Sequence, residues 1–305
     1  MDKRDLVMDA VSVIREDGER AVSLLRQVGL RLGPGEWVYL VGTNGSGKST
    51  LARLLAGLYV EGTTGRIDRG FAGDGPAPIV MQRPESQLFG DTPREEVLFA
   101  LEWRPHPALE PEAAARMALR AVGLAPRGDT PWAQLSGGER QLAAIAAATA
   151  GEAPLIVFDE ATSMLDGRNR RRAMDIARRC HAAGAAVVWV TQRLDELEPD
   201  RRVIALRDGR IRFDGSVRAF FYGEDGTEEA EGSDAAVPKA DAAGPPSAAD
   251  GNEKTQPLSP CERCGLTLPF MAALARQWRR AGRLADPLPV TREEWEAIGW
   301  RMEHG

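Results

Sequence analysis

The segment from Gly42 to Thr50 has the residue types and the spacing that hold a phosphate chain. It fits the pattern G-x-x-x-x-G-K-[ST]. Glycines can take positive φ and bring backbone N–H groups against phosphate oxygens, and a helix N-terminus adds partial positive charge. We predict that Lys48 reaches the outer phosphates of a nucleoside triphosphate and that Ser49 ligates Mg²⁺. The predicted binding residues are Gly42, Thr43, Asn44, Gly45, Ser46, Gly47, Lys48, Ser49 and Thr50.

The flanking sequence predicts that this segment is a loop between a strand and a helix. An apolar run, Trp37 to Val41, precedes it, and leucines at helical spacing follow it from Leu51 to Leu58. The alternative is a glycine turn with a chance Lys-Ser pair. The strand, loop and helix context favours the phosphate site over that alternative.

Two adjacent acids, Asp159 and Glu160, follow the uninterrupted apolar run Leu155 to Phe158. Such a run is typical of a central parallel strand covered on both faces. Carboxylates at its end are costly unless something compensates their charge. A magnesium ion held by Ser49 and Asp159 would do so and would leave Glu160 to accept a proton from an attacking water. The alternative is that the two acids only cap the next helix.

Polar amides follow two other expected strands. Gln82 comes after residues 79–81, and Gln192 comes after the buried run 186–191. The carboxyl ends of strands in an α/β sheet line the crevice where ligands bind. Gln82 taken alone is weak support for a site.

A second candidate anion site begins at Ser136, in the run Leu-Ser-Gly-Gly-Glu-Arg-Gln from 135 to 141. Ser136, Gly137 and Gly138 stand where an alanine-rich helix begins, and they offer a hydroxyl and backbone N–H groups to an anion. They would equally serve as an ordinary helix cap. The residues by themselves leave both interpretations open.

Composition indicates a globular chain with a charged insert. The 305 residues are 43% hydrophobic with a formal charge of -6, and the segment 224–257 holds nine acids against Lys239 and Lys254. That segment contains almost only Glu, Asp, Gly, Ala, Ser, Pro, Thr and Lys and can bury little apolar area, so we expect a disordered acidic linker. No basic block indicates a nucleic-acid surface, and no apolar run of membrane-spanning length occurs. Three cysteines without a signal peptide favour a reducing compartment.

These features predict three parts. Residues 1–223 form a nucleotide-binding domain that begins with antiparallel strands and has a glycine- and turn-rich stretch from 62 to 78. Residues 224–257 are the linker, and residues 258–305 are a helical tail too small for an independent core, which we expect to dock on another surface or a second copy. Cys261 and Cys264 supply only half a zinc site, so we favour two ordinary thiols.

The order of these motifs resembles the nucleotide-binding subunit of ATP-binding cassette (ABC) proteins over residues 5–223. The Leu-Ser-Gly-Gly-Glu run distinguishes that class from other P-loop ATPases. The run Gln82 to Phe89 with Glu95-Glu96-Val97, and more loosely the tail segments 265–270 and 290–294 with Trp300, are similar to the energy-coupling factor group, whose tail dimerises. The fold implied is α/β of the P-loop type with an N-terminal antiparallel β subdomain, a helical signature subdomain and a small C-terminal helical segment.

The resemblance implies an ATPase that powers uptake of a vitamin or metal ion through separate transmembrane subunits, from the cytoplasmic face of the membrane. It implies a head-to-tail dimer of one or two kinds of chain, with ATP and Mg²⁺ as cofactors. Glu160, Gln192 and Gln82 are then the catalytic residues, and Ser49, Gln82 and Asp159 the metal ligands. The partner's ATP would contact Ser136, Gly137, Gly138, Glu139 and Asp166.

Two departures from the family pattern keep an alternative open. Val13, Ile14 and Arg15 stand where the family usually has an aromatic residue that stacks on adenine, although a guanidinium can also stack. Gln192 stands where the family has a histidine, and an amide cannot become cationic. These departures motivate a second hypothesis, a weakly hydrolysing partner of a more active cassette. A soluble cassette ATPase acting on DNA or ribosomes is a third, less favoured hypothesis.

Overall fold

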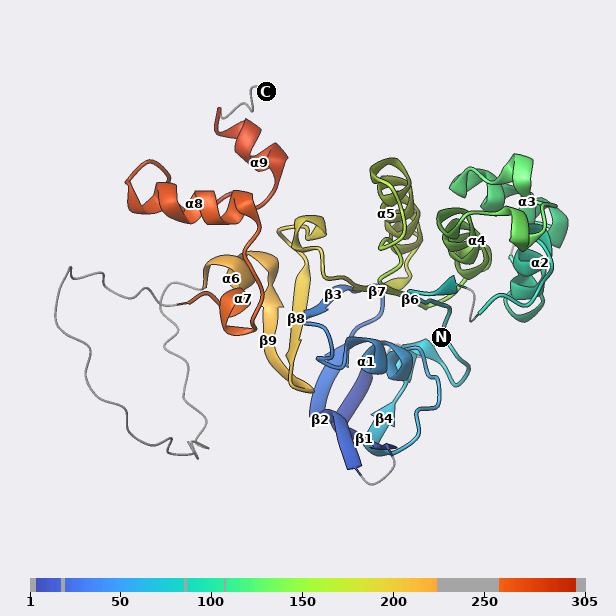
Figure 1. Cartoon of the computed structure of the whole chain (residues 1–305), viewed down its shortest axis with the longest axis horizontal. Helices are drawn as coiled ribbons and strands as arrows, with labels where there is room; N and C mark the ends of the chain where they lie inside the picture. Colours follow the sequence, from blue (N-terminus) through green and yellow to red (C-terminus); the bar gives the residue numbers. More distant parts are fainter. Residues whose placement is uncertain (1–3, 18–19, 85–86, 107, 224–257, 300–305) are drawn as a thin grey trace.

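The computed structural model describes residues 4–17, 20–84, 87–106, 108–223 and 258–299. Two sheets form the centre of the molecule, and helices cover them (Figure 1). The acidic linker expected at 224–257 and Trp300 lie outside the described residues. Among the helices that are described, none has both the length and the apolar character needed to cross a membrane.

The larger sheet has six strands in the order β5-β6-β7-β3-β8-β9. Neighbouring strands are parallel from β5 to β8, and β9 is antiparallel to β8. This order brings the carboxyl ends of β5, β6, β7 and β3 to one edge. The bounds are β3 Trp37–Gly42, β5 Ile79–Val80, β6 Leu155–Asp159, β7 Ala186–Val190, β8 Arg202–Arg207 and β9 Arg210–Ser216.

The smaller sheet is antiparallel, with the order β2-β1-β4. Its strands are β1 Leu6–Asp17, β2 Arg20–Leu32 and β4 Thr63–Asp68. The antiparallel strands expected before residue 37 are confirmed. The glycine- and turn-rich stretch expected at 62–78 also contains a strand that was not predicted, β4, which pairs with β1 along one edge. Most of its side chains are exposed or half-buried, so no apolar alternation marks it in the sequence.

Two apolar cores lie on opposite faces of the larger sheet. In β3, Val38 and Leu40 face the core shared with α1 and the smaller sheet, while Tyr39 and Val41 face the core shared with the other helices. Helices α2, α3 and α4 pack together, and α4 also packs on α5. The helices to this point are α1 Lys48–Leu55, α2 Pro93–Trp103, α3 Pro111–Val122, α4 Gly137–Thr149, α5 Gly167–Ala182 and α6 Val217–Tyr222. Short 3₁₀ turns are η1 Gly70–Ala72, η3 Ala125–Arg127, η4 Trp132–Gln134 and η5 Leu194–Glu196.

The tail forms α7 Pro260–Arg263, α8 Phe270–Arg280 and α9 Arg292–Ala297. It docks on α6 of its own chain rather than standing apart (Figure 1). The Tyr222 hydroxyl donates to the Pro289 carbonyl at 2.5 Å, and Arg218 forms an ion pair with Glu294 at 2.6 Å. The described tail has a small apolar cluster of its own around Trp295, and it adds Cys261, Cys264 and Ala272 to the cassette core. This shared packing suits a segment too small for an independent core.

The two tail cysteines are buried thiols. Cys261 and Cys264 are free and belong to the same apolar core as α4 and α5. Burial raises the pKa of the Cys261 thiol to about 12. Among the described residues, no group of three or more His, Cys, Asp or Glu side chains is arranged to hold a metal ion.

Candidate active site

The loop between β3 and α1 has the backbone that phosphate binding requires. Gly42, Gly45 and Gly47 all take positive φ, as expected from the sequence. A Cβ on Gly42 would lie 2.4 Å from the Leu206 carbonyl oxygen, and one on Gly47 would lie 2.6 Å from the Leu24 carbonyl oxygen. These positions therefore admit only glycine.

Lys48 is buried at the start of α1, with 5% of its surface exposed. Its Nζ donates to the carbonyls of Gly42 at 2.9 Å and Thr43 at 3.0 Å. Burial lowers the pKa of Lys48, and the carboxylates of Glu160 and Asp159 oppose that shift. The Ser46 hydroxyl is buried in the same loop without a hydrogen-bond partner among the described residues. A buried cation beside an unpartnered hydroxyl suits a bound phosphate chain.

Asp159 ends β6 beside the first turn of α1. The Ser49 hydroxyl donates to its Oδ1 at 3.2 Å. Burial raises the pKa of Asp159, and the bond from Ser49 opposes that shift. A buried carboxylate next to a hydroxyl is a donor set of the kind that Mg²⁺ accepts, so these residues fit the metal expected here.

Glu160 receives hydrogen bonds from both predicted amides. Gln82 Nε2 donates to its Oε2 at 2.8 Å, and Gln192 Nε2 donates to its Oε1 at 2.5 Å. Glu160 itself is in the left-handed region at φ 50°, and its N–H donates to the Val190 carbonyl at 3.1 Å. A non-glycine residue in this region is strained, and such residues concentrate at functional sites. The structure thus brings all three predicted catalytic side chains together.

Comparison with known proteins agrees with this geometry. Residues 25–163 match the ABC transporter family. The energy-coupling factor transporter ATP-binding protein EcfA1 of Halalkalibacterium halodurans is 33% identical over 238 residues, spanning 75% of this chain and 84% of that protein. The protein of the same name from Lacticaseibacillus paracasei is 35% identical over 206 residues, spanning 65% and 74%. The chain belongs to the ABC transporter ATP-binding family.

Solved structures confirm the predicted cassette fold. A dimeric ATP-binding cassette in a post-hydrolysis state bound to ADP and phosphate matches with a TM-score of 0.61 and 25% identity, covering 70% of this chain and all of that one. A bacterial Atm1-family ABC exporter with ATP bound matches with a TM-score of 0.59 and 27% identity, covering 70% of this chain and 39% of that one. The cassette described here is an ATP hydrolase of the P-loop type.

The cassette signature lies in a different part of the chain from the phosphate loop. Ser136 caps α4 and forms a capping box with Glu139: its N–H donates to Glu139 at 2.9 Å, and its hydroxyl accepts from the Glu139 N–H at 3.2 Å. Asp166 caps α5 through the Asn169 N–H at 2.8 Å. Among the described residues no hydrogen bond joins residues 136–139 or Asp166 to the phosphate loop. Within one chain, Ser136 and Asp166 therefore act as helix caps.

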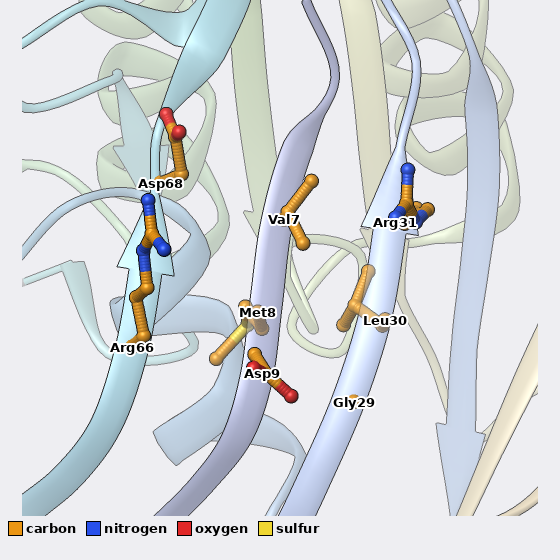
Figure 2. Close-up of a pocket in the computed structure, with 8 residues that line it drawn as sticks. All are labelled: Val7, Met8, Asp9, Gly29, Leu30, Arg31, Arg66 and Asp68. Carbon is orange, nitrogen blue, oxygen red and sulfur yellow. The ribbon is translucent and has the colours of Figure 1, made fainter.

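The tail lines a groove beside the phosphate loop, which the sequence did not predict. This groove of about 580 Å³ has walls from the phosphate loop, from the segment after β7 and from the tail residues Gly265 to Phe270. A second groove of about 590 Å³ lies on the smaller sheet and shares no residue with the site (Figure 2). The charged residues that line this second groove are two arginines, Arg31 and Arg66, and two aspartates, Asp9 and Asp68, so their charges cancel.

The sequence analysis did not predict Glu196, an acid next to this site. Glu196 follows Gln192 by four residues, and its carboxylate is almost fully covered, with 12% of the side chain exposed. The sequence feature that could have indicated Glu196 is its position four residues after Gln192, a polar residue at the end of a strand. That signal is weak because most acids in such a segment face solvent.

Proposed function

We propose that this cassette binds and hydrolyses ATP with Mg²⁺ to power uptake of a micronutrient, a vitamin or a metal ion, through a separate transmembrane complex of the energy-coupling factor type. The main support is the arrangement of Glu160, which accepts hydrogen bonds from the amides of Gln82 and Gln192. This carboxylate lies next to the hydrogen-bonded pair of Ser49 and Asp159 at the phosphate loop. The relatives named above as energy-coupling factor ATP-binding proteins support the transport role.

We infer a task for each side chain from this geometry. Lys48 and the loop amides would hold the phosphate chain, and Ser49, Asp159 and Gln82 would hold Mg²⁺, which offsets phosphate charge when bound. Glu160 would accept the proton of the attacking water. Gln82 and Gln192 donate to opposite oxygens of that carboxylate, so they would orient it. Gln192 would also reach a phosphate oxygen through its amide N–H.

A second cassette chain would complete the site. Ser136, Gly137, Gly138 and Glu139 stand at the N-terminus of α4, where backbone N–H groups can face an anion. Asp166 is exposed at the start of α5. We assign these residues to the ATP of the partner chain, and we assign residues 258–305, after the linker 224–257, to a segment that supports the same dimer. Residues 1–223 are then the ATP-binding domain.

An aromatic surface after Gln82 is the proposed contact with the transmembrane subunit. Phe89 and Trp103 are each 76% exposed, and Phe89 packs on Phe99 with ring centroids 5.5 Å apart. Exposed apolar clusters of this kind mark interaction sites. This contact would hold the cassette at the cytoplasmic face of the membrane as a peripheral subunit.

Purification of the tagged chain from membranes tests the proposed role. We expect it to bring down a second cassette chain and a polytopic membrane protein, in a complex whose ATPase activity depends on Mg²⁺. Phe89→Ser should release the membrane protein and retain the cassette partner, whereas Tyr59→Ser, at a residue that is 89% exposed elsewhere on the surface, should retain both. Recovery with ribosomes and without any membrane protein would instead favour a soluble role.

The amide at Gln192 supports one alternative, a cassette that hydrolyses weakly and mainly completes its partner's site. Gln192 donates to Glu160, but it cannot carry the positive charge that a histidine can. We expect Gln192→His to raise steady-state turnover by about threefold to tenfold under this alternative. The measurement is ATPase rate at saturating ATP, and an unchanged or lower rate would count against it.

A further inference from the structure

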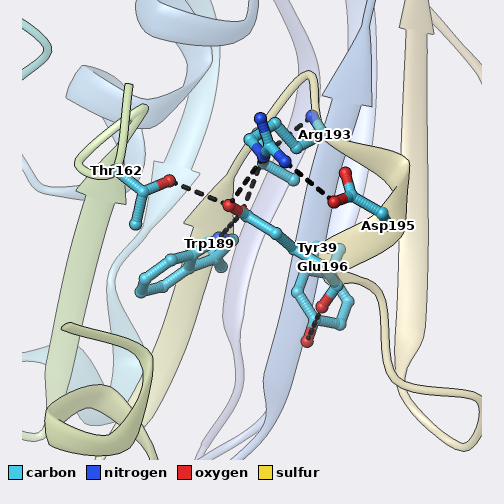
Figure 3. A network of polar contacts seen from close by, with 7 residues as sticks. Tyr39, Thr162, Trp189, Arg193, Asp195 and Glu196 are labelled. Atoms are coloured by element: carbon cyan, nitrogen blue, oxygen red, sulfur yellow. Dashed lines mark hydrogen bonds and ion pairs between the residues drawn. The ribbon is translucent and has the colours of Figure 1, made fainter. Parts of the chain in front are cut away.

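Glu196 is the centre of a partly buried polar network next to the active site (Figure 3). Its Oε1 accepts from the Thr162 hydroxyl at 3.0 Å and lies 3.3 Å from Arg193 Nε. Its Oε2 accepts from Trp189 Nε1 at 3.1 Å and from the Thr191 hydroxyl at 3.0 Å. The Glu196 carbonyl accepts from the Tyr39 hydroxyl at 3.1 Å. The carboxylate therefore has a donor on every side.

The donors come from segments that carry the catalytic side chains. Thr162 lies two residues after Glu160, in the loop that leads to Asp166. Thr191 and Arg193 flank Gln192 directly, and the Thr191 hydroxyl also accepts from the Arg193 N–H at 2.9 Å. Glu196 thus contacts the side chains on both sides of Gln192 and one side chain of the loop that follows Glu160.

The chemistry of the donors requires a carboxylate at this position. Indole and guanidinium N–H groups can only donate, whereas hydroxyls can donate or accept. Each oxygen of Glu196 faces one such obligate donor, Arg193 on one side and Trp189 on the other. A glutamine would point its NH₂ group at one of these two N–H groups, and two donors that face each other cannot form a hydrogen bond. Glu196 is therefore not interchangeable with its own amide.

We propose that Glu196 is a positioning residue that sets the contact between Gln192 and Glu160 and thereby controls hydrolysis. This inference rests on the proposed function, because it takes Glu160 as the base. Rotation or displacement of the Gln192 backbone would move its amide away from the 2.5 Å contact with Glu160. The residues predicted to bind the phosphates, 42–50, include none of these donors, so the effect should fall on turnover rather than on ATP binding.

The test compares four variants of the full chain in its assembled complex. We expect Glu196→Gln to lower kcat about tenfold and to change the KM for ATP less than about threefold. Because Glu196 acts through Gln192, the double variant with Gln192→Ala should be no slower than Gln192→Ala alone. Glu198→Gln is the matched control: Glu198 pairs with Arg178 and Arg201 and should leave kcat unchanged. A wild-type kcat in Glu196→Gln, or effects that multiply in the double variant, would overturn the proposal.

One further variant keeps the test decisive if Glu196→Gln folds poorly. Thr162→Val removes one donor to Glu196 with little change in side-chain size, and we expect it to lower kcat about threefold while the chain remains folded. An unchanged kcat in Thr162→Val would contradict the proposal. Full turnover in Glu160→Gln would instead show that the base is misassigned.

Discussion

Replacing Glu160 with glutamine should lower steady-state ATP turnover by at least about a hundredfold, the scale of a lost general base. The amide keeps the size of the carboxylate but cannot accept the proton of the attacking water. Among the described residues, the hydrogen-bond partners of the Glu160 side chain are Gln82 and Gln192, and neither belongs to the phosphate loop. ATP affinity should therefore stay within about threefold of the wild-type value. Phosphate release and equilibrium nucleotide binding, measured on the same preparation, separate the two effects.

A nearby acid provides the control for Glu160. Glu152 is exposed in the segment before β6, whereas Glu160 follows β6, so Glu152→Gln removes one carboxylate at the other end of the strand without touching the site. Its turnover should match the wild-type chain. Near-normal turnover in Glu160→Gln would mean that another group activates the water, and the roles given to Gln82 and Gln192 would fall with it.

Replacing Lys48 with methionine should weaken ATP binding by at least about a hundredfold, which corresponds to roughly 2.7 kcal/mol. Lys48 is the buried cation of the phosphate loop and spans it by donating to Gly42 and Thr43. Methionine preserves the apolar stem but removes both hydrogen bonds and the charge that would face the phosphates. Titration of a fluorescent ATP analogue measures the loss, and turnover at cellular ATP concentrations should disappear with it.

Arg53→Met is the control for Lys48. Arg53 lies on the same helix but is exposed, so its loss changes the local charge equally without entering the loop. Binding should change less than about threefold, because exposed charges are well screened. Equal losses in both variants would indicate a general electrostatic effect and would contradict a direct phosphate contact by Lys48.

Much of the cassette fold could be predicted from local sequence. Gly42, Gly45 and Gly47 were expected at positive φ because their spacing matches a loop that must approach phosphate closely, and the structure confirms it. The end of β6 at Asp159 followed from an apolar run that is typical of a central strand. The capping boxes at Ser136 and Thr291 also depend only on neighbours three residues apart.

Other elements left too little local signal. β4 has few buried side chains and exists because its backbone pairs with β1, a partner about fifty residues earlier in the chain. The docking of the tail on α6 rests on Arg218 and Tyr222, whose partners Glu294 and Pro289 come after the linker. No periodic pattern in the sequence predicts the pairing of β4 with β1 or the contacts of the tail with α6.

By itself, the sequence determined which side chains have the chemistry proposed for phosphate binding, Mg²⁺ ligation and activation of water, because that chemistry belongs to side-chain type and to spacing within one loop. Only the tertiary structure decided that Gln82 and Gln192 meet on the two oxygens of Glu160, and that Glu196 holds Gln192 in place. The physical reason is strand order. β5, β6 and β7 are neighbours in the sheet although long helical segments separate β5 from β6 and β6 from β7, and hydrogen bonds a few ångströms long form only where that order brings the strand ends together.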